Sequence, residues 1–565
     1  MIRKRIDQLK KKFINLKIDG YIVPKNDEFF SEYSKKDRLK FISNFSGSAG
    51  YAIILKKKNY LLVDSRYTIQ AELESKDQFK IIKLEDIVNC KLFKSITIGF
   101  DPKLFTSNQI SNFFLKFNKV KEIDINLIDI LMKQSSFISK PFFSLSKNIV
   151  GQSHLDKIKK VSNYLKKNNS DYLFVSAPEN VAWILNIRGF DNPNSPIPNC
   201  RLLINNKNRF FLIAERKKLK KLIQEKKITK KQIIEPTNFE HLIDKIDKGK
   251  IIIDDKSCSI FYETLIAKKF KILKKQDPIY FYKSIKNKIE IKNMIQSHIF
   301  DGAALTKFLY WIKKINKKKI TEFEAQKKLE SFRKQNKNYL FPSFNTIAGA
   351  GANGAIVHYK ANKENSRIIN KKDIFLCDSG GQYSYGTTDV TRTICFSPPK
   401  NSVKNIFTRV LKGHIAVANT DLKKYFTGKM IDVLARKSLK EKKLDYGHGT
   451  GHGVGFFLNV HEGPQAISKL NEVKICEGMI LSNEPGFYKK GSFGVRIENL
   501  VYVKKIKNRL SFKNLTLAPI EKELINFKLL NSEEKQYLFK YHFEVYQKIS
   551  KFLNKNEKKW LASII

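Results

Sequence analysis

Side chains that could carry out chemistry are concentrated in one part of this 565-residue chain. Five of its nine histidines fall between residues 358 and 461. In the same region Asp378 and Asp389 flank a Gly-rich turn between two apolar segments, so that two neighbouring strands can bring both carboxylates to one point. Carboxylates that converge inside a β-rich core repel each other unless a cation neutralises them. A pair of solvated turn aspartates is the alternative for this segment taken alone.

The segments that follow add further possible ligands. A Gly-rich stretch contains His448, His452 and His461, and its glycines permit positive φ angles and a close approach of the backbone to a ligand. Glu484 in SNEPG and Glu498 in VRIEN each interrupt an otherwise apolar stretch. Four carboxylates with at least one imidazole suit a pair of hard to borderline divalent ions such as Mn²⁺ or Co²⁺, whereas a lone structural Zn²⁺ prefers cysteine or more histidine.

Other polar residues of this region have simpler interpretations. Cys377 precedes Asp378, and strand alternation directs it to the opposite face. His414 follows Gly413 in a predicted helix and is expected to be an ordinary helix residue. The six cysteines are scattered without a CxxC pair, which predicts buried thiols in a reducing cytoplasm. They are Cys90, Cys200, Cys258, Cys377, Cys395 and Cys476.

The first half of the chain contains two copies of one α/β pattern. Residues 19–24 and 171–176 are similar apolar segments, and each follows an amphipathic Lys-rich helix. A strand–turn–strand pattern comes next in each copy, at residues 51–66 and 201–216, with an offset of 150 for both strands (203 − 53 and 213 − 63). Chance similarity of two hairpins is the alternative. Arg66, at the end of the first hairpin after Asp64, is a possible substrate contact, and a surface ion pair is the alternative.

The composition first suggests a nucleic-acid partner. Lys and Arg number 107 and Asp and Glu 54, so the net charge is 107 − 54 = +53. Lysine is nevertheless mixed with Asn and Ile along the whole chain, and no segment interleaves basic residues with stacking aromatics, so we expect no nucleic-acid partner. No run approaches the roughly 18 apolar residues of a membrane span. Residues 1–17 predict the first helix of a domain, with a mitochondrial presequence as the alternative.

The carboxylates and histidines resemble a known metal site. Their spacing, with GHGTGHGVG, NVHEGP, SNEPG and VRIEN, closely resembles the dinuclear site of the aminopeptidase P family, whose catalytic domain has the pita-bread (creatinase/methionine aminopeptidase) fold. FISNFSGSAG, VDSRY, ENVAWILNIRG, KSIKNKIEIKNM and the tail ending in Trp560-Leu561 extend the resemblance to the long, three-domain cytosolic branch. Ser65 stands where the family often has Gly, which affects only the local turn.

The resemblance implies an α/β (α+β) architecture of three domains. Two creatinase-type α/β domains, residues 1–145 and 146–285, would precede a pita-bread catalytic domain at 286–565 with a C-terminal extension from about 505 to 565. In the metal site Asp378 would chelate one ion, Asp389 and Glu498 would bridge both, and His452 and Glu484 would complete the second.

The resemblance also implies roles for the residues around the metals. His358 and His461 would bind substrate and stabilise the tetrahedral intermediate, and His448 would lie beside them in the substrate channel. Arg496, two residues before Glu498 and on the same face of that strand, would orient a bridging carboxylate.

The implied activity is release of an N-terminal amino acid from peptides whose second residue is proline. Two divalent ions, Mn²⁺ or alternatively Co²⁺ or Zn²⁺, would hold a bridging hydroxide, and Glu484 would pass the water's proton to the leaving nitrogen. A cytoplasmic homodimer is expected from the family. A prolidase that cuts only Xaa-Pro dipeptides and a non-catalytic peptide-binding protein are the alternatives.

Overall fold

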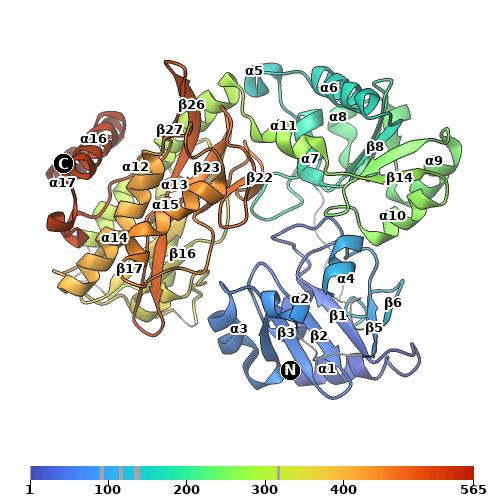
Figure 1. The fold of residues 1–565 in the computed structure, drawn as a ribbon, viewed down its shortest axis with the longest axis horizontal. Coiled ribbons are helices and arrows are strands. Elements are labelled where there is room, and N and C mark those ends of the chain that lie inside the picture. Colours follow the sequence, from blue (N-terminus) through green and yellow to red (C-terminus); the bar gives the residue numbers. More distant parts are fainter. Residues whose placement is uncertain (1, 90–94, 114–118, 133–139, 315–318, 365) are drawn as a thin grey trace. The chain divides into compact units, whose positions relative to one another are not determined.

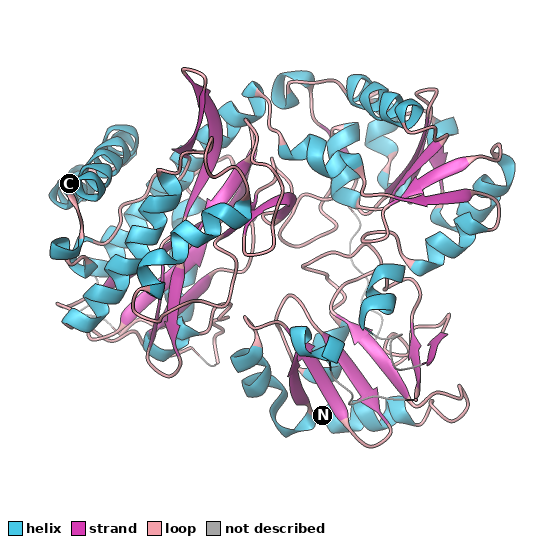
Figure 2. Cartoon of the chain, in the orientation of Figure 1, coloured by secondary structure: helices cyan, strands magenta, loops and turns pink. Residues whose placement is uncertain are grey.

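The structure, a computed structural model, describes residues 2–89, 95–113, 119–132, 140–314, 319–364 and 366–565. The chain divides into two compact units, Met1–Tyr280 and Phe281–Ile565 (Figure 1). Within each unit helices cover strands that form the centre (Figure 2). Among the described residues no helix combines the length and apolar character that crossing a membrane requires.

The first unit contains two six-stranded mixed sheets. The first has the order β4-β3-β2-β1-β5-β6 and the second the order β12-β11-β10-β8-β13-β14. The strands of the first sheet are β1 (Gly20–Pro24), β2 (Tyr51–Leu55), β3 (Asn59–Val63), β4 (Lys80–Lys83), β5 (Thr97–Phe100) and β6 (Lys119–Glu122). Those of the second are β8 (Tyr172–Val175), β10 (Arg201–Asn205), β11 (Phe210–Ile213), β12 (Ile233–Ile234), β13 (Lys250–Ile253) and β14 (Lys271–Lys274), and a small separate pair is β7 (Phe143–Ser144) with β9 (Ile187–Arg188).

The two sheets repeat one topology, as the sequence repeat predicts. In both sheets the first strand, β1 or β8, pairs antiparallel with the first strand of a hairpin, β2 or β10. On its other side it pairs parallel with a later strand, β5 or β13. The constant offset of 150 is wrong for the second hairpin strand, because Ile53 pairs with Tyr60 whereas Leu203 pairs with Phe211, an offset of 211 − 60 = 151. The second turn is one residue longer, and Asn208 at φ 63° accommodates it.

Short helices accompany these sheets. The expected N-terminal helix is present but ends at Lys10, with Ile6 and Leu9 on its buried face. The helices of this unit are α1 (Ile2–Lys10), α2 (Arg38–Ser43), α3 (Thr68–Ser75), α4 (Ser107–Phe113), α5 (Lys147–Val150), α6 (His154–Lys167), α7 (Pro178–Leu185), α8 (Lys220–Gln224), α9 (Phe239–Lys245) and α10 (Ile260–Ala267). Helix α11 (Pro278–Ser284) leads the chain into the second unit.

The second unit is built from antiparallel strands. Its sheets have the orders β16-β17-β20, β15-β18-β19, β22-β21-β23-β26-β27 and β24-β25. The strands are β15 (Tyr339–Pro342), β16 (Ile347–Ala350), β17 (Ile374–Ser379), β18 (Gly381–Tyr383), β19 (Gly386–Thr387), β20 (Val390–Cys395), β21 (Gly451–Gly453), β22 (Glu462–Ile467), β23 (Ile480–Asn483), β24 (Gly486–Lys489), β25 (Phe493–Arg496), β26 (Asn499–Ile506) and β27 (Arg509–Asn514).

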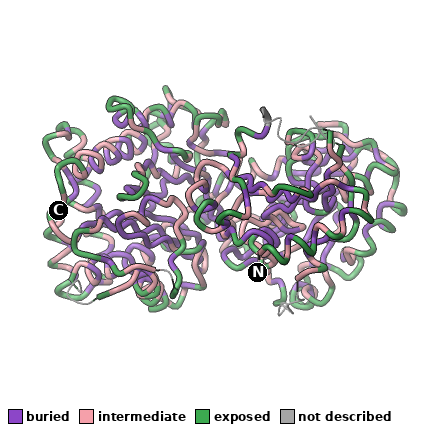
Figure 3. The backbone as a smooth tube through the Cα atoms, turned by 90° about the horizontal axis from the view of Figure 1, so that it is seen from below, coloured by how far each residue is buried: buried purple, intermediate pink, exposed green. Residues whose placement is uncertain are grey.

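Helices of the described part of this unit pack against these strands and against one another. They are α12 (Lys288–Lys314), α13 (Glu322–Arg333), α14 (Asn401–Ala418), α15 (Gly428–Lys440), α16 (Ser532–Ile549) and α17 (Lys555–Ile564). β17 and β20 are buried along their whole length, although β20 carries Thr391, Arg392 and Thr393. Figure 3 shows buried backbone through the interior of each unit and exposed backbone at its periphery. The interior of the second unit therefore offers a dry environment for the polar residues carried on these strands.

Candidate metal centre

The two predicted aspartates lie on neighbouring strands. Asp378 is in β17, and Asp389 directly precedes β20, which pairs antiparallel with β17 so that Asp378 faces Thr391. The Gly-rich connection that the sequence suggests contains the short strands β18 and β19. This pairing brings both carboxylates to one end of a buried ribbon, and both side chains are buried.

The other three predicted ligands come from one five-stranded sheet. His452 is the central residue of β21, not a loop residue as its Gly-rich surroundings suggest. Glu484 follows the last residue of β23, and Glu498 precedes the first residue of β26. Strand β23 pairs with both β21 and β26, so the side chains arise from adjacent strands.

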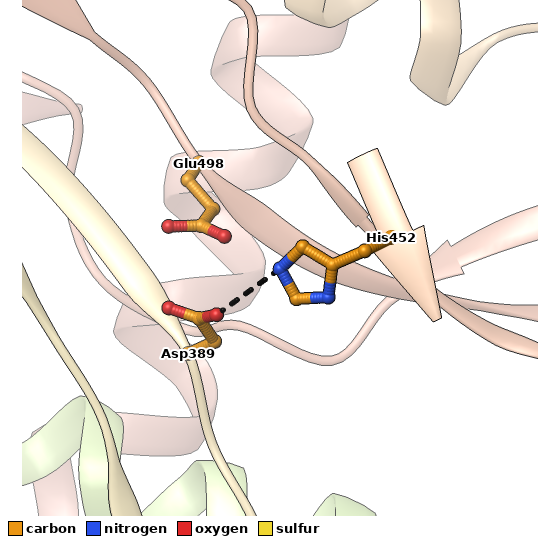
Figure 4. Close-up of side chains that lie close together, drawn as sticks. All are labelled: Asp389, His452 and Glu498. Carbon is orange, nitrogen blue, oxygen red and sulfur yellow. Dashed lines mark ion pairs between the residues drawn. The ribbon is translucent and has the colours of Figure 1, made fainter. Parts of the chain in front are cut away.

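The side chains converge within the distances that a metal ion requires. Asp389, His452 and Glu498 each offer a ligand atom, and these atoms all lie within 4.8 Å of one another (Figure 4). The His452 Nε2 atom lies 3.5 Å from Asp389 Oδ2 and 3.4 Å from Glu484 Oε1. His452 Nδ1 lies 2.9 Å from the carbonyl oxygen of Gly453. Since a carbonyl only accepts, Nδ1 carries the proton and Nε2 is directed at the carboxylates.

Hydroxyl groups orient the carboxylates. Thr391 Oγ1 donates a 2.7 Å hydrogen bond to Glu498 Oε2, and Ser482 Oγ donates a 3.0 Å bond to Glu484 Oε1. Ser482 Oγ also accepts the backbone N–H of His452 at 2.8 Å. Ser482 thus ties two predicted ligands to each other, so their relative position does not depend on a bound ion.

The electrostatics of the cluster are those of crowded negative charges. Burial, opposed in part by His452, raises the pKa of Asp389 from 3.8 to about 6. Burial, with the nearby Asp389, Glu484 and Asp378, also raises the pKa of Glu498 well above its usual value. Burial disfavours a charged His452, but Asp389 and Glu484 outweigh this and raise its pKa to about 9. The site therefore favours additional positive charge.

Arg496 supplies a fixed cation beside the cluster. Its Nη2 donates a 2.6 Å bond to Asp378 Oδ2, its Nε donates to Thr391 Oγ1 at 3.1 Å, and its Nη1 donates to the Tyr488 hydroxyl at 2.6 Å. The expectation that Arg496 and Glu498 share one strand is wrong. Arg496 ends β25, whereas Glu498 precedes β26 of another sheet, because the Glu498 N–H turns to the carbonyl of Thr391.

The donor set fits divalent metal ions. Asp378 Oδ1 is buried and has no hydrogen-bond partner among the described residues, although its other oxygen is paired with Arg496. A buried carboxylate oxygen without a donor is costly, and a cation satisfies it. Four carboxylates and one imidazole provide the oxygen-rich ligands that hard to borderline divalent ions prefer.

The remaining predicted histidines lie around this cluster. The rings of His461 and His452 are in edge contact, 4.4 Å between centroids. His448 Nε2 is 2.8 Å from the Tyr488 hydroxyl, which links His448 to Asp378 through Arg496. His358 lies in the turn after β16, directly after Val357, whose carbonyl oxygen is 3.5 Å from Arg496 Nη2.

Two other sequence expectations have different outcomes. Arg66 lies in the first unit and forms an ion pair with Asp64 at 2.7 Å, its stated alternative. His414, expected to be an ordinary helix residue, is fully buried on α14, and its Nδ1 lies 3.1 Å from the carbonyl oxygen of Asn483, which precedes Glu484. His414 therefore packs directly behind a predicted ligand.

None of the cysteines that the structure describes takes part in this cluster. Cys377 packs in a hydrophobic core on the face opposite Asp378. The five described cysteines are free thiols, and Cys90 lies outside the described residues. Cys395 lies near Glu521 and Glu523, but Lys313 already pairs with both carboxylates at 2.7 and 3.3 Å. That second group therefore has its neutralising cation.

Sequence reasoning missed several residues that support the site. Thr391 is two positions after Asp389, so strand alternation could have placed both side chains on the same face. The hydrogen bonds of Tyr488 to His448 and Arg496 have no local sequence signal. Glu322, at the start of α13, accepts bonds from the backbone N–H groups of Ala350 and Arg367 and from the Tyr359 hydroxyl. It thereby anchors residues on both sides of His358.

Glu462, directly after His461, is also anchored without any local sequence signal. Its carboxylate is buried against two lysines from the start of this unit, with Lys286 Nζ at 2.5 Å and Lys283 Nζ at 3.2 Å. Burial would raise the pKa of Glu462, but the two lysines outweigh it and lower that pKa below the usual value. This buried ion cluster fixes the backbone next to His461.

Sequence profiles of known protein families match nearly the whole chain. The sequence profile of metallopeptidase family M24 matches residues 292–505, and that of the C-terminal region of peptidase M24 matches residues 508–564. Two profiles of the creatinase/prolidase N-terminal domain match residues 5–129 and 133–290. The expected architecture of creatinase-type domains before a metallopeptidase domain is therefore confirmed.

Individual relatives are similar along their full length. A probable Xaa-Pro aminopeptidase P of Laccaria bicolor is 36% identical over 97% of this chain and 91% of its own length. Xaa-Pro aminopeptidase 1 of Dictyostelium discoideum is 35% identical over 100% of this chain and 96% of its own. The crystal structure of X-prolyl aminopeptidase from Caenorhabditis elegans, described as a cytosolic enzyme with a di-nuclear active site, superimposes with a TM-score of 0.92 at 29% identity, covering 100% of this chain and 99% of that one. The chain belongs to metallopeptidase family M24, in its Xaa-Pro aminopeptidase P branch.

Proposed function

We propose that this protein is a metal-dependent aminopeptidase that hydrolyses the bond between an N-terminal amino acid and a penultimate proline. The convergence of four carboxylates and one imidazole in the second unit carries the proposal. The names of relatives that match the whole chain support the substrate class.

We further propose which residues hold the metals. Asp378 would bind one ion, Asp389 and Glu498 would bind both, and His452 and Glu484 would complete the second, with Mn²⁺ the preferred ion. When bound, such a pair of ions lowers the pKa of a water molecule toward neutrality and polarises the scissile carbonyl. The di-nuclear site named for the C. elegans enzyme supports two ions.

Glu484 is the carboxylate best placed to move a proton. Its side chain is 17% exposed, against 5% for Asp389 and 11% for Asp378, so it is the most solvent-accessible of these three carboxylates. It would accept the proton of the attacking water and return it to the leaving nitrogen. Ser482 fixes Glu484 Oε1 for this transfer.

The histidines would bind and orient the peptide. His461 stands in edge contact with His452, and His358 directly precedes Tyr359, whose hydroxyl bonds to Glu322. Each would donate to the substrate carbonyl oxygen. The leaving nitrogen of an Xaa-Pro bond is a tertiary amide nitrogen, and like every amide leaving group it must gain a proton, which Glu484 would supply. His448, fixed by Tyr488, would line the channel beside them.

A direct test compares Asp389→Asn with Asp421→Asn, an exposed turn residue of the same unit. Each purified protein is loaded with Mn²⁺ and assayed on Ala-Pro-Ala, with Ala-Ala-Ala as the substrate control. We expect the wild type and Asp421→Asn to cleave only the proline peptide, and Asp389→Asn to be inactive. Full activity of Asp389→Asn refutes the ligand assignment.

The prolidase alternative is tested with the dipeptide Ala-Pro. The prolidase of Thermococcus sibiricus has a TM-score of 0.53 at 25% identity and covers only 66% of this chain. The additional chain favours the aminopeptidase, which we expect to cleave Ala-Pro-Ala in preference to Ala-Pro. The non-catalytic alternative requires that the purified protein bind no Mn²⁺, Co²⁺ or Zn²⁺, which elemental analysis measures.

Three further expectations remain proposals. The boundaries 1–145, 146–285 and 286–565 are supported by the matched ranges and by the division after Tyr280. A cytoplasmic location is supported by the free thiols and by the cytosolic enzyme of C. elegans. The homodimer is a prediction that sedimentation equilibrium tests.

A further inference from the structure

We propose that helix α16 positions the predicted bridging ligand Glu498, and that it acts through Tyr541 and the buried Arg392. The two residues are positioning residues: neither belongs to the predicted ligands, and both lie behind the metal site. This inference rests on the metal site proposed above, and it assigns a role in the reaction to the chain beyond residue 508, which lies outside the range matched by the catalytic-domain profile.

Arg392 is a buried cation whose bonds join three parts of the second unit. It lies in β20, three residues after Asp389, and is 1% exposed. Six uncharged acceptors lie 2.6 to 3.0 Å from its guanidinium nitrogens, and three of them share the two N–H groups of Nη2. The acceptors are the carbonyl oxygens of Thr391, Glu498, Ala518 and Pro519, the Asn499 Oδ1 atom and the Tyr541 hydroxyl.

The absence of a carboxylate among these acceptors determines what Arg392 can do. A buried charge is tolerated only where its hydrogen-bonding groups are satisfied, so Arg392 is held by the positions of these dipoles. Equally, each carbonyl is held by the guanidinium. The Glu498 carbonyl oxygen accepts the shortest of the six bonds, 2.6 Å from Nη1.

Glu498 is therefore fixed to β20 at three atoms. Its carbonyl accepts from Arg392, its N–H donates to the carbonyl of Thr391 at 3.2 Å, and its Oε2 accepts from Thr391 Oγ1 at 2.7 Å. Asp389, the other predicted bridging ligand, directly precedes the same strand. These bonds set the separation of the two bridging carboxylates.

Tyr541 connects this arrangement to helix α16. It lies in α16 and is 2% exposed. Its hydroxyl accepts from Arg392 Nη2 at 2.8 Å and lies 2.8 Å from the carbonyl oxygen of Ala518, to which it donates. The next residue, His542, accepts the backbone N–H of Ile520 at 3.0 Å through Nε2. Two successive side chains of α16 thus fix the segment that supplies two of the acceptors of Arg392.

Removing the Tyr541 hydroxyl takes away one of the three acceptors around Arg392 Nη2 and one of the two donors to the Ala518 carbonyl oxygen, which also accepts from Arg392. We expect the guanidinium to shift toward its remaining acceptors, and the Glu498 carbonyl to follow because it shares that guanidinium. Changes to groups that orient metal ligands typically weaken metal binding 10- to 100-fold. We expect a displaced Glu498 to alter both the affinity and the coordination geometry of the bound ions.

The test uses the full-length protein with Co²⁺ as the probe. Tyr541→Phe keeps the ring and its packing, and Tyr546→Phe is the matched control, since Tyr546 lies on the same helix and packs against the same core. Calorimetric titration of the chelator-treated proteins with CoCl₂ gives Kd and stoichiometry. The visible absorption of bound Co²⁺ reports the ligand geometry, and a thermal scan of each metal-free protein shows that it is folded.

We expect Tyr541→Phe to raise the Kd for Co²⁺ by about 10-fold or more and to change the absorption bands at saturation, with Tyr546→Phe unchanged. Arg392→Lys, which cannot reach all of these acceptors, is expected to have at least as large an effect. A Tyr541→Phe protein that melts at a lower temperature but keeps the wild-type Kd and spectrum overturns the inference and leaves the proposed function intact. A wild-type protein that binds no Co²⁺ overturns both.

Discussion

The charge on Asp389 is expected to destabilise the protein whenever metal is absent, so that replacing this predicted ligand stabilises the metal-free form. Asp389 is buried, and its pKa is raised from 3.8 to about 6 by burial and by the neighbouring Asp378 and Glu484, against a smaller effect of His452. A folded-state pKa above the unfolded value means that the folded protein binds more protons. Stability therefore falls as the pH rises through this window.

The size of the effect follows from the shift. Two pKa units at about 1.4 kcal/mol each give about 3 kcal/mol. The asparagine side chain of Asp389→Asn has nearly the shape of a protonated aspartate, but it does not ionise. Relative to this variant, the metal-free wild type should be equally stable near pH 4, lose stability up to about pH 6, and stay about 3 kcal/mol less stable above it. For a unit of this size that difference corresponds to roughly 6 °C in the unfolding temperature.

Differential scanning calorimetry of the two chelator-treated proteins between pH 4 and 8 measures this difference. Comparing the two proteins removes the titration of groups that do not interact with Asp389, so the remaining difference comes from Asp389 together with its neighbours His452 and Glu498. Asp421→Asn controls for a lost surface carboxylate. Mn²⁺ should then stabilise only the wild type, by about 2.7 kcal/mol when the free ion is 100-fold above its Kd, so the order reverses above that ratio. A metal-free Asp389→Asn no more stable than the wild type at pH 8 would refute the reasoning.

Three further substitutions test the groups around the cluster. Arg496→Met removes the donor of Asp378 and is expected to weaken Mn²⁺ binding about 10- to 100-fold in a calorimetric titration; an unchanged Kd contradicts this role. Glu322→Gln weakens the hydrogen bonds that hold the backbone around His358, and it should raise KM several-fold with little change in kcat. A wild-type KM would show that these bonds are dispensable. Glu462→Gln leaves two buried lysines without a carboxylate and should cost about 3–5 kcal/mol, seen as a lower unfolding temperature.

The part of the site that could be predicted from sequence is the part that local patterns determine. Asp378 and Asp389 interrupt apolar strand segments around a Gly-rich turn, and that pattern places them on paired strands. The repeat in the first half likewise predicts two sheets of one topology. The extra residue in the second hairpin turn was missed because polar turns of both lengths are compatible with the same flanking strands.

The supporting residues could not be predicted, because their partners lie far apart in the chain. Lys286 and Glu462 are 176 positions apart, and Arg392 and Tyr541 are 149 apart. Neither pair has a local spacing that marks it. The break between Arg496 and Glu498 was missed for a related reason: the Glu498 N–H bonds to Thr391, on a strand 107 residues earlier, and not to a neighbour of its own segment.

The difference between exposed and buried cations explains how a chain of net charge +53 carries an acidic site. Most of its lysines are at the surface, where solvent and salt screen them within about 8 Å. Three fully buried arginines of the second unit have another function, since each bonds to an atom next to or within a predicted site residue. They are Arg333, bonded to Ser379 Oγ after Asp378, Arg392, bonded to the carbonyl of Glu498, and Arg436, bonded to the carbonyl of His448. Burial, and not the number of basic residues, therefore selects the cations that determine the geometry of the metal site.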